Sequence, residues 1–91
     1  MEKMSSENEQ SARWTPKQGQ CLAFIYAYTT LHGQAPAERD IERFFRITSF
    51  SAHSMVLALD REGLIRRQPG AARSLSLLVQ PEDLPVLRRP A

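Results

Sequence analysis

The side chains with the most chemical potential lie in two short stretches of the sequence. Residues 48–54 hold several hydroxyls, one aromatic ring and one imidazole, and three arginines follow within residues 66–73. Hydroxyls and imidazoles bond to base edges or phosphates, an aromatic ring can contact a thymine methyl group, and guanidinium groups bind phosphates. The candidate nucleic-acid contacts are Thr48, Ser49, Phe50, Ser51, His53, Ser54, Arg66, Arg67 and Arg73, with Lys17 and Arg39 as weaker candidates.

Enzymatic and metal chemistry lack their usual residue patterns. Cys21, His32 and His53 are spread over different predicted elements, without the paired spacing of zinc ligands. Helix geometry brings no pair among Ser51, His53 and Asp60 into contact as nucleophile and base, and the sequence has no glycine-rich phosphate loop. We therefore expect no catalytic residue, metal, cofactor or small-molecule ligand.

Length and charge limit the class of protein. The 91 residues suffice for one modest core and leave no room for a large enclosed active site. Residues 14–78 carry eight basic side chains against five acidic ones, and no acid lies between Glu62 and Glu82. A positive surface is expected between residues 62 and 82, although a run of like charges is also typical of a solvated face. Composition divides the chain into a flexible tail (1–13), one domain (14–79) and a proline-rich tail (80–91).

The apolar residues indicate a cytoplasmic protein. The longest apolar stretch, residues 21–28, is far shorter than a membrane span, and the polar, acidic start of the chain lacks the basic end of a signal peptide. The single Cys21 has no internal disulfide partner and reads as a small buried hydrophobe. We expect no membrane contact.

Three helices are predicted to carry the candidate residues. Thr15 and Pro16 mark the start of the first, which ends before Gly33. The second covers about residues 37–45, with Ile41, Phe44 and Phe45 on its buried stripe. The third covers about 50–62, is capped by Thr48 and Ser49, and has its core face at Ala52, Met55 or Val56, and Leu59.

Aromatic side chains of these helices are expected to pack in the core rather than to stack on single-stranded nucleic acid. These aromatic residues are Phe24, Tyr26, Tyr28, Phe44 and Phe45. At Phe50, packing as a staple at the helix start is favoured over base contact.

After Leu64 the pattern changes to two short strands, residues 64–67 and 75–79, joined at a Pro69-Gly70 turn. The fold class is therefore mainly α with a small β-hairpin, a three-helix winged helix-turn-helix. In that geometry the third helix enters the major groove of duplex DNA. Prolines argue against a long helix after Gln80, although Leu84, Val86 and Leu87 can dock back on the body.

Several segments resemble a known family. They are Thr15-Pro16-Lys17-Gln18, Gly33-Gln34-Ala35-Pro36, Asp40-Ile41, Leu57-Ala58-Leu59 with Glu62-Gly63-Leu64-Ile65-Arg66-Arg67, and Pro69-Gly70-Ala71-Ala72-Arg73-Ser74. They are similar to the N-terminal DNA-binding domain of LexA-type bacterial SOS repressors over residues 14–78. Residues 43–48, 55–57 and 63–70 also resemble small stand-alone bacterial proteins of that domain family. The resemblance implies a bacterial, nucleoid-associated location.

The resemblance implies that Thr48, Phe50, Ser51, His53 and Ser54 reach base edges and that residues 70–73 approach the DNA backbone. The family favours polar or acidic residues at His53 and Ser54, and a small polar residue or proline near Phe50, so we expect a different operator. Ala37 replaces a usual threonine cap, at a cost of about 1 kcal/mol. The chain ends where the family's self-cleaving protease domain begins, so we expect no self-cleavage.

The leading hypothesis is a sequence-specific regulator of transcription, a repressor by occlusion, that binds double-stranded DNA and pairs as a homodimer on a two-fold site. It is not an enzyme. The alternatives are a protein-interaction adaptor, with Leu57 partly exposed on the third helix, and an antirepressor that pairs with a full-length regulator.

Overall fold

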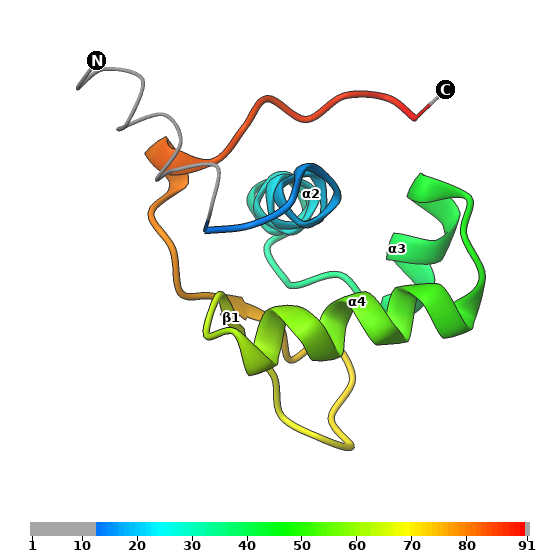
Figure 1. Cartoon of the computed structure of the whole chain (residues 1–91). Helices are drawn as coiled ribbons and strands as arrows, with labels where there is room; N and C mark the ends of the chain where they lie inside the picture. Colours follow the sequence, from blue (N-terminus) through cyan, green and yellow to red (C-terminus); the bar gives the residue numbers. More distant parts are fainter. Residues whose placement is uncertain (1–12, 91) are drawn as a thin grey trace, which may run out of the picture.

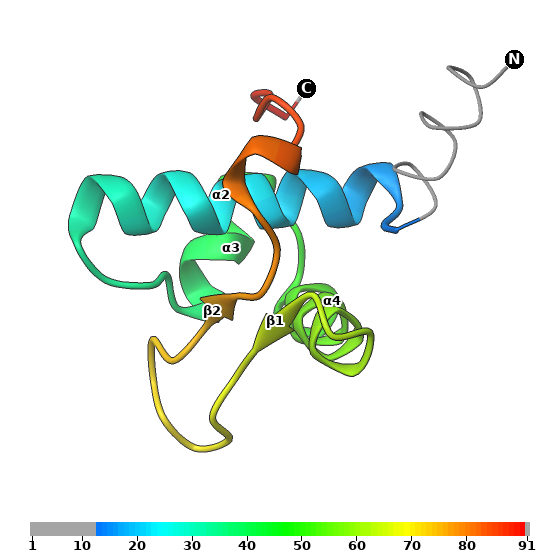
Figure 2. The same ribbon diagram turned by 90° about the vertical axis from the view of Figure 1, so that its left-hand side faces the viewer.

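Three helices and a two-stranded hairpin make up the computed structural model, which describes residues 13–90. In chain order the elements are α2 (Pro16–His32), α3 (Glu38–Phe45), α4 (Ser49–Arg61), β1 (Ile65–Arg66), β2 (Ser76–Leu77) and the 3₁₀ turn η1 (Pro81–Asp83). The C-terminal segment crosses α2 on the side away from α4 (Figure 1). α4 and the loop between the strands lie at the opposite end of the molecule (Figure 2). The predicted fold class is confirmed.

Capping bonds set the ends of α2 where the sequence predicts them. The Thr15 hydroxyl accepts a hydrogen bond from the Gln18 N–H at 3.1 Å, and the Gln18 side-chain oxygen accepts from the Thr15 N–H at 2.9 Å. Gly33 ends the helix with φ 76°, a left-handed conformation that costs glycine little. Local sequence therefore determines the length of α2.

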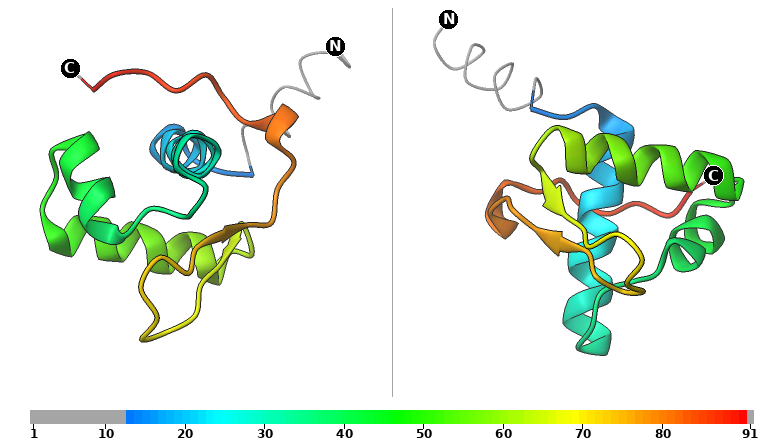
Figure 3. Two further views of the ribbon diagram at one scale, coloured as in Figure 1. Left: turned by 180° about the vertical axis from the view of Figure 1, so that it is seen from behind. Right: turned by 90° about the horizontal axis from the view of Figure 1, so that it is seen from below.

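A three-residue link joins α3 to α4 and gives the pair its helix-turn-helix form. Arg46 ends α3 in the left-handed region, with φ 56°, and Thr48 caps α4 by accepting from the Ser51 N–H at 3.1 Å. Figure 3 shows α4 crossing α2, with α3 beside both. The link holds α4 at a fixed angle to the rest of the body.

The core lies where the three helices meet β1. Its largest fully buried side chains include one or more from each of these elements, namely Leu22, Ile25, Ile41, Val56, Leu59 and Ile65. Phe24 stacks on Phe44 with ring centroids 4.7 Å apart. The predicted core face of α4 is confirmed, with Val56 fully buried and Met55 half-buried.

The single cysteine is part of this core. Cys21 is fully buried, as predicted. Burial raises the pKa of its thiol to about 12, so the group is a neutral thiol at physiological pH. It behaves as a small hydrophobe.

Two predictions about aromatic residues were wrong. Tyr26 is 43% exposed, because it follows the buried Ile25 and the next position around a helix is turned by about 100°. Phe50 is 79% exposed and does not act as a core staple. It lies two positions before the buried Ala52, which places it on nearly the opposite side of α4.

The hairpin is shorter than predicted. β1 and β2 are antiparallel, with Ile65 opposite Leu77 and Arg66 opposite Ser76. Beyond that point the Gln68 N–H donates to the Ser74 hydroxyl at 2.9 Å, and the same hydroxyl donates back to the Gln68 carbonyl at 3.2 Å. The Ser74 side chain thus takes the place of the backbone hydrogen bonds between the strands, and the β-pairing ends there. The name "wing" is used below for residues 65–77, and "wing loop" for residues 67–75.

One side chain of α2 forms two hydrogen bonds with the C-terminal segment. The Gln20 amide donates to the Val86 carbonyl at 2.9 Å, and its oxygen accepts from the Arg88 N–H at 2.8 Å. Leu84 and Leu87 pack against the core, whereas Val86 is exposed. Residues 80–90 therefore lie on the body, and residues 1–12 of the predicted tail (1–13) fall outside the described residues.

Candidate DNA-binding surface

The start of α4 presents an exposed, polar and aromatic face. Ser49, Phe50 and Ser54 are exposed, and their side chains point away from the core. The first turn of α4 carries no acidic residue, so the partial positive charge of the helix N-terminus is not neutralised there. An exposed helix start of this kind favours the approach of a phosphate or of an electronegative base edge.

Two of the predicted contact residues also serve the helix cap. The Thr48 hydroxyl accepts from the Ser51 N–H and donates to the Ser51 hydroxyl, both at 3.1 Å. Both side chains remain exposed. Ser51 keeps its own hydroxyl proton for an outside acceptor, whereas Thr48 is committed mainly to the cap.

His53 is tied to α3. Its Nδ1 lies 3.1 Å from each carboxylate oxygen of Glu38, at the first turn of α3. The pair is only partly exposed, with 49% of the His53 side chain and 34% of the Glu38 side chain accessible. This contact orients the ring and leaves Nε2 as the nitrogen available to an outside partner.

The wing presents Arg66 and Arg67 beside α4. Arg66 is exposed and Arg67 is half-buried. Pro69 and Gly70 form the predicted turn, in which Gly70 has φ 79° and the Ala71 N–H donates to the Gln68 carbonyl at 3.1 Å. Within residues 13–90 neither arginine has an ion-pair partner, so both charges are available to an external anion.

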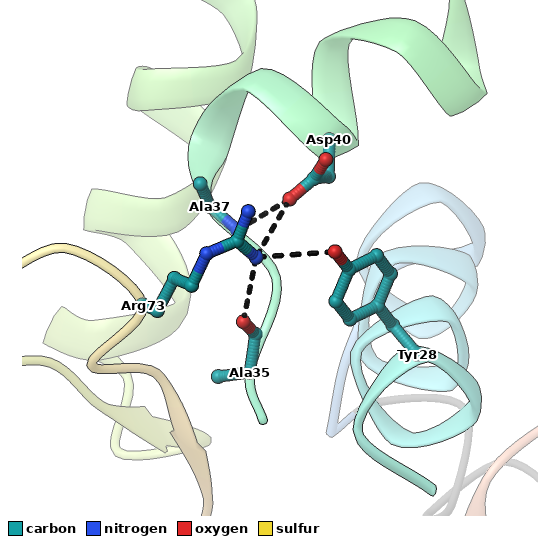
Figure 4. Close-up of polar contacts among 5 residues, drawn as sticks. All are labelled: Tyr28, Ala35, Ala37, Asp40 and Arg73. Atoms are coloured by element: carbon teal, nitrogen blue, oxygen red, sulfur yellow. Dashed lines mark hydrogen bonds and ion pairs between the residues drawn. The ribbon is translucent and has the colours of Figure 1, made fainter. Parts of the chain in front are cut away.

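Arg73 differs from the other two wing arginines because its guanidinium points into the protein (Figure 4). Its Nη1 lies 3.1 Å from the Tyr28 hydroxyl, 3.2 Å from the Ala35 carbonyl oxygen and 3.2 Å from Asp40 Oδ2. The guanidinium carbon also lies 5.9 Å from the centroid of the Tyr28 ring. The structure thus separates Arg73 from Arg66 and Arg67.

Asp40 links this cluster to the start of α3. Its Oδ2 accepts the Ala37 N–H at 2.8 Å, which replaces the side-chain cap that Ala37 lacks. Partial burial alone raises the pKa of Asp40, but the Ala37 hydrogen bond and the charge of Arg73 outweigh it and hold the pKa below its ordinary value. Asp40 is therefore ionised at physiological pH and attracts the guanidinium.

The two weaker candidates lie in the first turns of their helices. Lys17 on α2 and Arg39 on α3 are both exposed. Lys17 lines a groove of about 780 Å³ between α2, the start of α4 and the C-terminal segment. The other residues lining this groove include Trp14, Phe45, Ile47, Ser51, Met55, Val86, Arg88 and Arg89.

Sequence reasoning missed the partners that orient the candidate residues. The sequence predicts Tyr28 as a core aromatic ring and predicts no contact for Glu38 or Asp40. Each contacts a residue at least 15 positions away, and no local pattern predicts such a contact. A non-glycine residue in the left-handed region, such as Arg73, leaves no mark in the sequence either.

The part of the chain that the structure describes holds neither a metal-binding cluster nor a membrane-spanning helix. Among residues 13–90, no three histidine, cysteine, aspartate or glutamate side chains gather closely enough to hold a metal ion. No helix in that range combines the length and the apolar character needed to cross a membrane.

Comparison with known proteins identifies the same domain. The family model for the LexA DNA-binding domain matches residues 11–74. A LexA repressor of Thermosipho africanus is 40% identical over 72 residues, which is 79% of this chain and 36% of that protein. A LexA repressor of Geobacter metallireducens is 40% identical over 70% of this chain and 32% of its own length. The chain thus spans about a third of the length of these curated relatives.

Proposed function

The chain belongs to the LexA DNA-binding domain family, and on that premise we propose that it binds duplex DNA in a sequence-specific manner and regulates transcription as a non-enzymatic repressor. The observation that carries the proposal is the shared position of two surfaces. α4 and the wing loop lie on the same side of the molecule, and the C-terminal segment crosses α2 on the opposite side (Figure 1). The matched relatives are named repressors, which supports repression.

In this proposal α4 enters the major groove and reads base edges through Ser49, Phe50, Ser51, His53 and Ser54. Arg66 and Arg67 on the wing bind phosphates, which adds affinity without sequence preference. Lys17 and Arg39 supply further phosphate contacts from neighbouring helix starts. The contacts of α4 differ in type from those of the wing, so they can be separated by mutation.

Selection of bound fragments from a bacterial genome tests the function directly. Fragments retained by the protein at moderate salt are expected to share a short motif, and affinity for that motif is expected to fall linearly with the logarithm of salt concentration. Retention that is independent of sequence, or no retention of duplex DNA at low salt, contradicts the proposal.

A second candidate is an adaptor that docks a protein, favoured by the apolar groove beside Trp14 and Met55. Duplex binding separates the two functions. An adaptor without DNA-binding activity shows no salt-dependent retention on DNA, and its partner protects Trp14 and Met55 in the groove from solvent instead of the exposed Phe50 and Ser54.

We further propose that two copies pair on a two-fold DNA site. One recognition helix and one small wing bury only about 600–1,000 Å² on DNA, which seldom supports tight specific binding by a monomer. Sedimentation of the protein with a selected duplex is expected to give two proteins per duplex. One protein per specific duplex at saturation, with a footprint shorter than a helical turn, contradicts pairing.

A further inference from the structure

The conformation of the wing loop requires an anchor. Outside the short β1–β2 pairing, its residues are exposed or half-buried, so apolar packing does little to fix it. Arg73 adopts φ 55°, a left-handed conformation that costs a non-glycine residue about 1 kcal/mol or more. Such a conformation persists only where the surroundings hold it. The Ser74 hydroxyl bonds within the wing loop, whereas the Arg73 side chain joins the loop to α2 and α3.

These contacts join three separate parts of the protein. Nη1 carries two hydrogens, which the Tyr28 hydroxyl on α2, the Ala35 carbonyl before α3 and Asp40 on α3 share (Figure 4). Asp40 at the same time holds the Ala37 N–H at the start of α3. The position of the wing is thereby linked to the helix that precedes the recognition helix.

We propose that Arg73 is a positioning residue, whose guanidinium holds the wing against α2 and α3 instead of binding a DNA phosphate. This inference rests on the proposed DNA-binding function and refines it. Its effect on DNA passes through Arg66 and Arg67, which the anchored wing presents beside α4. The side chains of Arg73 and Asp40 are 36% and 18% exposed, so the pair is partly shielded from solvent and from competing anions.

Neutralising Asp40 distinguishes the two roles of Arg73 by the sign of the effect. Asp40→Asn removes a negative charge and keeps an oxygen for the Ala37 N–H. If Arg73 binds a phosphate, this variant frees its guanidinium and strengthens DNA binding. If Arg73 anchors the wing, the variant loosens the wing and weakens binding, by roughly three- to tenfold.

Glu42→Gln is the matched control, because it removes one negative charge from a half-buried residue of the same helix. It is expected to leave binding unchanged or slightly tighter. Tyr28→Phe removes one acceptor of Arg73 without changing charge and is expected to weaken binding by a smaller factor. A direct phosphate contact by Arg73 predicts no effect of this variant.

The experiment measures the affinity of each protein for a selected duplex, at a temperature where circular dichroism shows all of them to be folded. The proteins are the wild type, Asp40→Asn, Tyr28→Phe, Arg73→Ala, the double variant of Asp40 and Arg73, and Glu42→Gln. Weaker binding by Asp40→Asn, with a double variant no weaker than Arg73→Ala, supports the anchor. In the absence of DNA, faster hydrogen exchange of the Ala71 N–H in Asp40→Asn than in the wild type supports the anchor independently. Tighter or unchanged binding by Asp40→Asn overturns it, whereas failure of the wild type to bind any duplex overturns the proposed function instead.

Discussion

The helical body and the wing keep their shapes through different kinds of contact. In the body, side chains such as Leu22, Ile41 and Leu59 are fully buried against one another. In the wing loop, a turn, one serine hydroxyl and the Arg73 guanidinium hold an exposed backbone. Partly exposed polar contacts stabilise a fold far less than core packing does. The body therefore decides whether the chain folds, and in the proposed function the wing decides how the folded chain meets DNA.

The largest expected effect is in the body. Leu59→Ala removes a fully buried side chain at the contact of α4 with the core and is expected to lower the free energy of unfolding by about 2–5 kcal/mol. Urea unfolding followed by circular dichroism measures the loss. Leu57→Ala, on the half-buried side of the same helix, is the control and should cost clearly less. Equal losses at the two positions contradict the assignment of the core face of α4.

Gly19 gives a second test of the body, because helix propensity and packing predict opposite signs there. A Cβ at Gly19 lies 3.0 Å from the Trp14 ring and 3.1 Å from Pro85. Overpacking of about 1–3 kcal/mol is expected to exceed the gain of about 1 kcal/mol in helix propensity, so Gly19→Ala destabilises the protein. A rise in melting temperature for this variant shows that Pro85 is not packed on α2.

Alanine substitutions at Gly63 and Gly70 compare the body with the wing loop, because the two glycines have nearly the same backbone conformation. Their φ values are 76° and 79°, and a Cβ at either meets no atom within 4 Å. Alanine costs about 1 kcal/mol of strain in this conformation. At Gly63, between α4 and β1, the whole cost is expected to lower the free energy of unfolding. At Gly70 the wing loop rearranges locally, so DNA affinity falls more than stability does. Equal losses of stability refute this division.

The smallest effect concerns pH. The pKa of Asp40 lies below its ordinary value of 3.8, so its carboxylate contributes stability that is complete above that pH and is lost as pH falls through the lower folded value. The stability advantage of the wild type over Asp40→Asn is expected to shrink below about pH 4 in urea unfolding. An advantage that grows on acidification contradicts the role of Asp40.

The same contrast explains what the sequence could predict. Thr15, Gly33 and Thr48 act on their own helix ends, so the body could be predicted from local rules. Apolar spacing identified Ala52 and Leu59 on the core face of α4, and left Met55 and Val56 as alternatives between them. The turn at Gly70 was predicted for the same reason.

The polar contacts that orient the site could not be predicted in this way. The contacts of Arg73 with Tyr28 and Asp40, and of His53 with Glu38, join distant residues, and their geometry exists only after the core has formed. The exposure of Phe50 follows from its spacing to the buried Ala52, which outweighs the tendency of an aromatic ring at a helix start to pack on the core.

The most direct test of the division of labour between α4 and the wing compares two variants on two duplexes. The triple variant Ser51→Ala, His53→Ala and Ser54→Ala is measured beside the double variant Arg66→Ala and Arg67→Ala, on a selected duplex and on a scrambled one, as a function of salt. We expect the triple variant to lose about 1–3 kcal/mol of preference per lost base pairing and to keep its affinity for the scrambled duplex. The double variant should weaken binding to both duplexes alike and reduce the salt slope by about two. An intact sequence preference in the triple variant, or an unchanged salt slope in the double variant, contradicts the account.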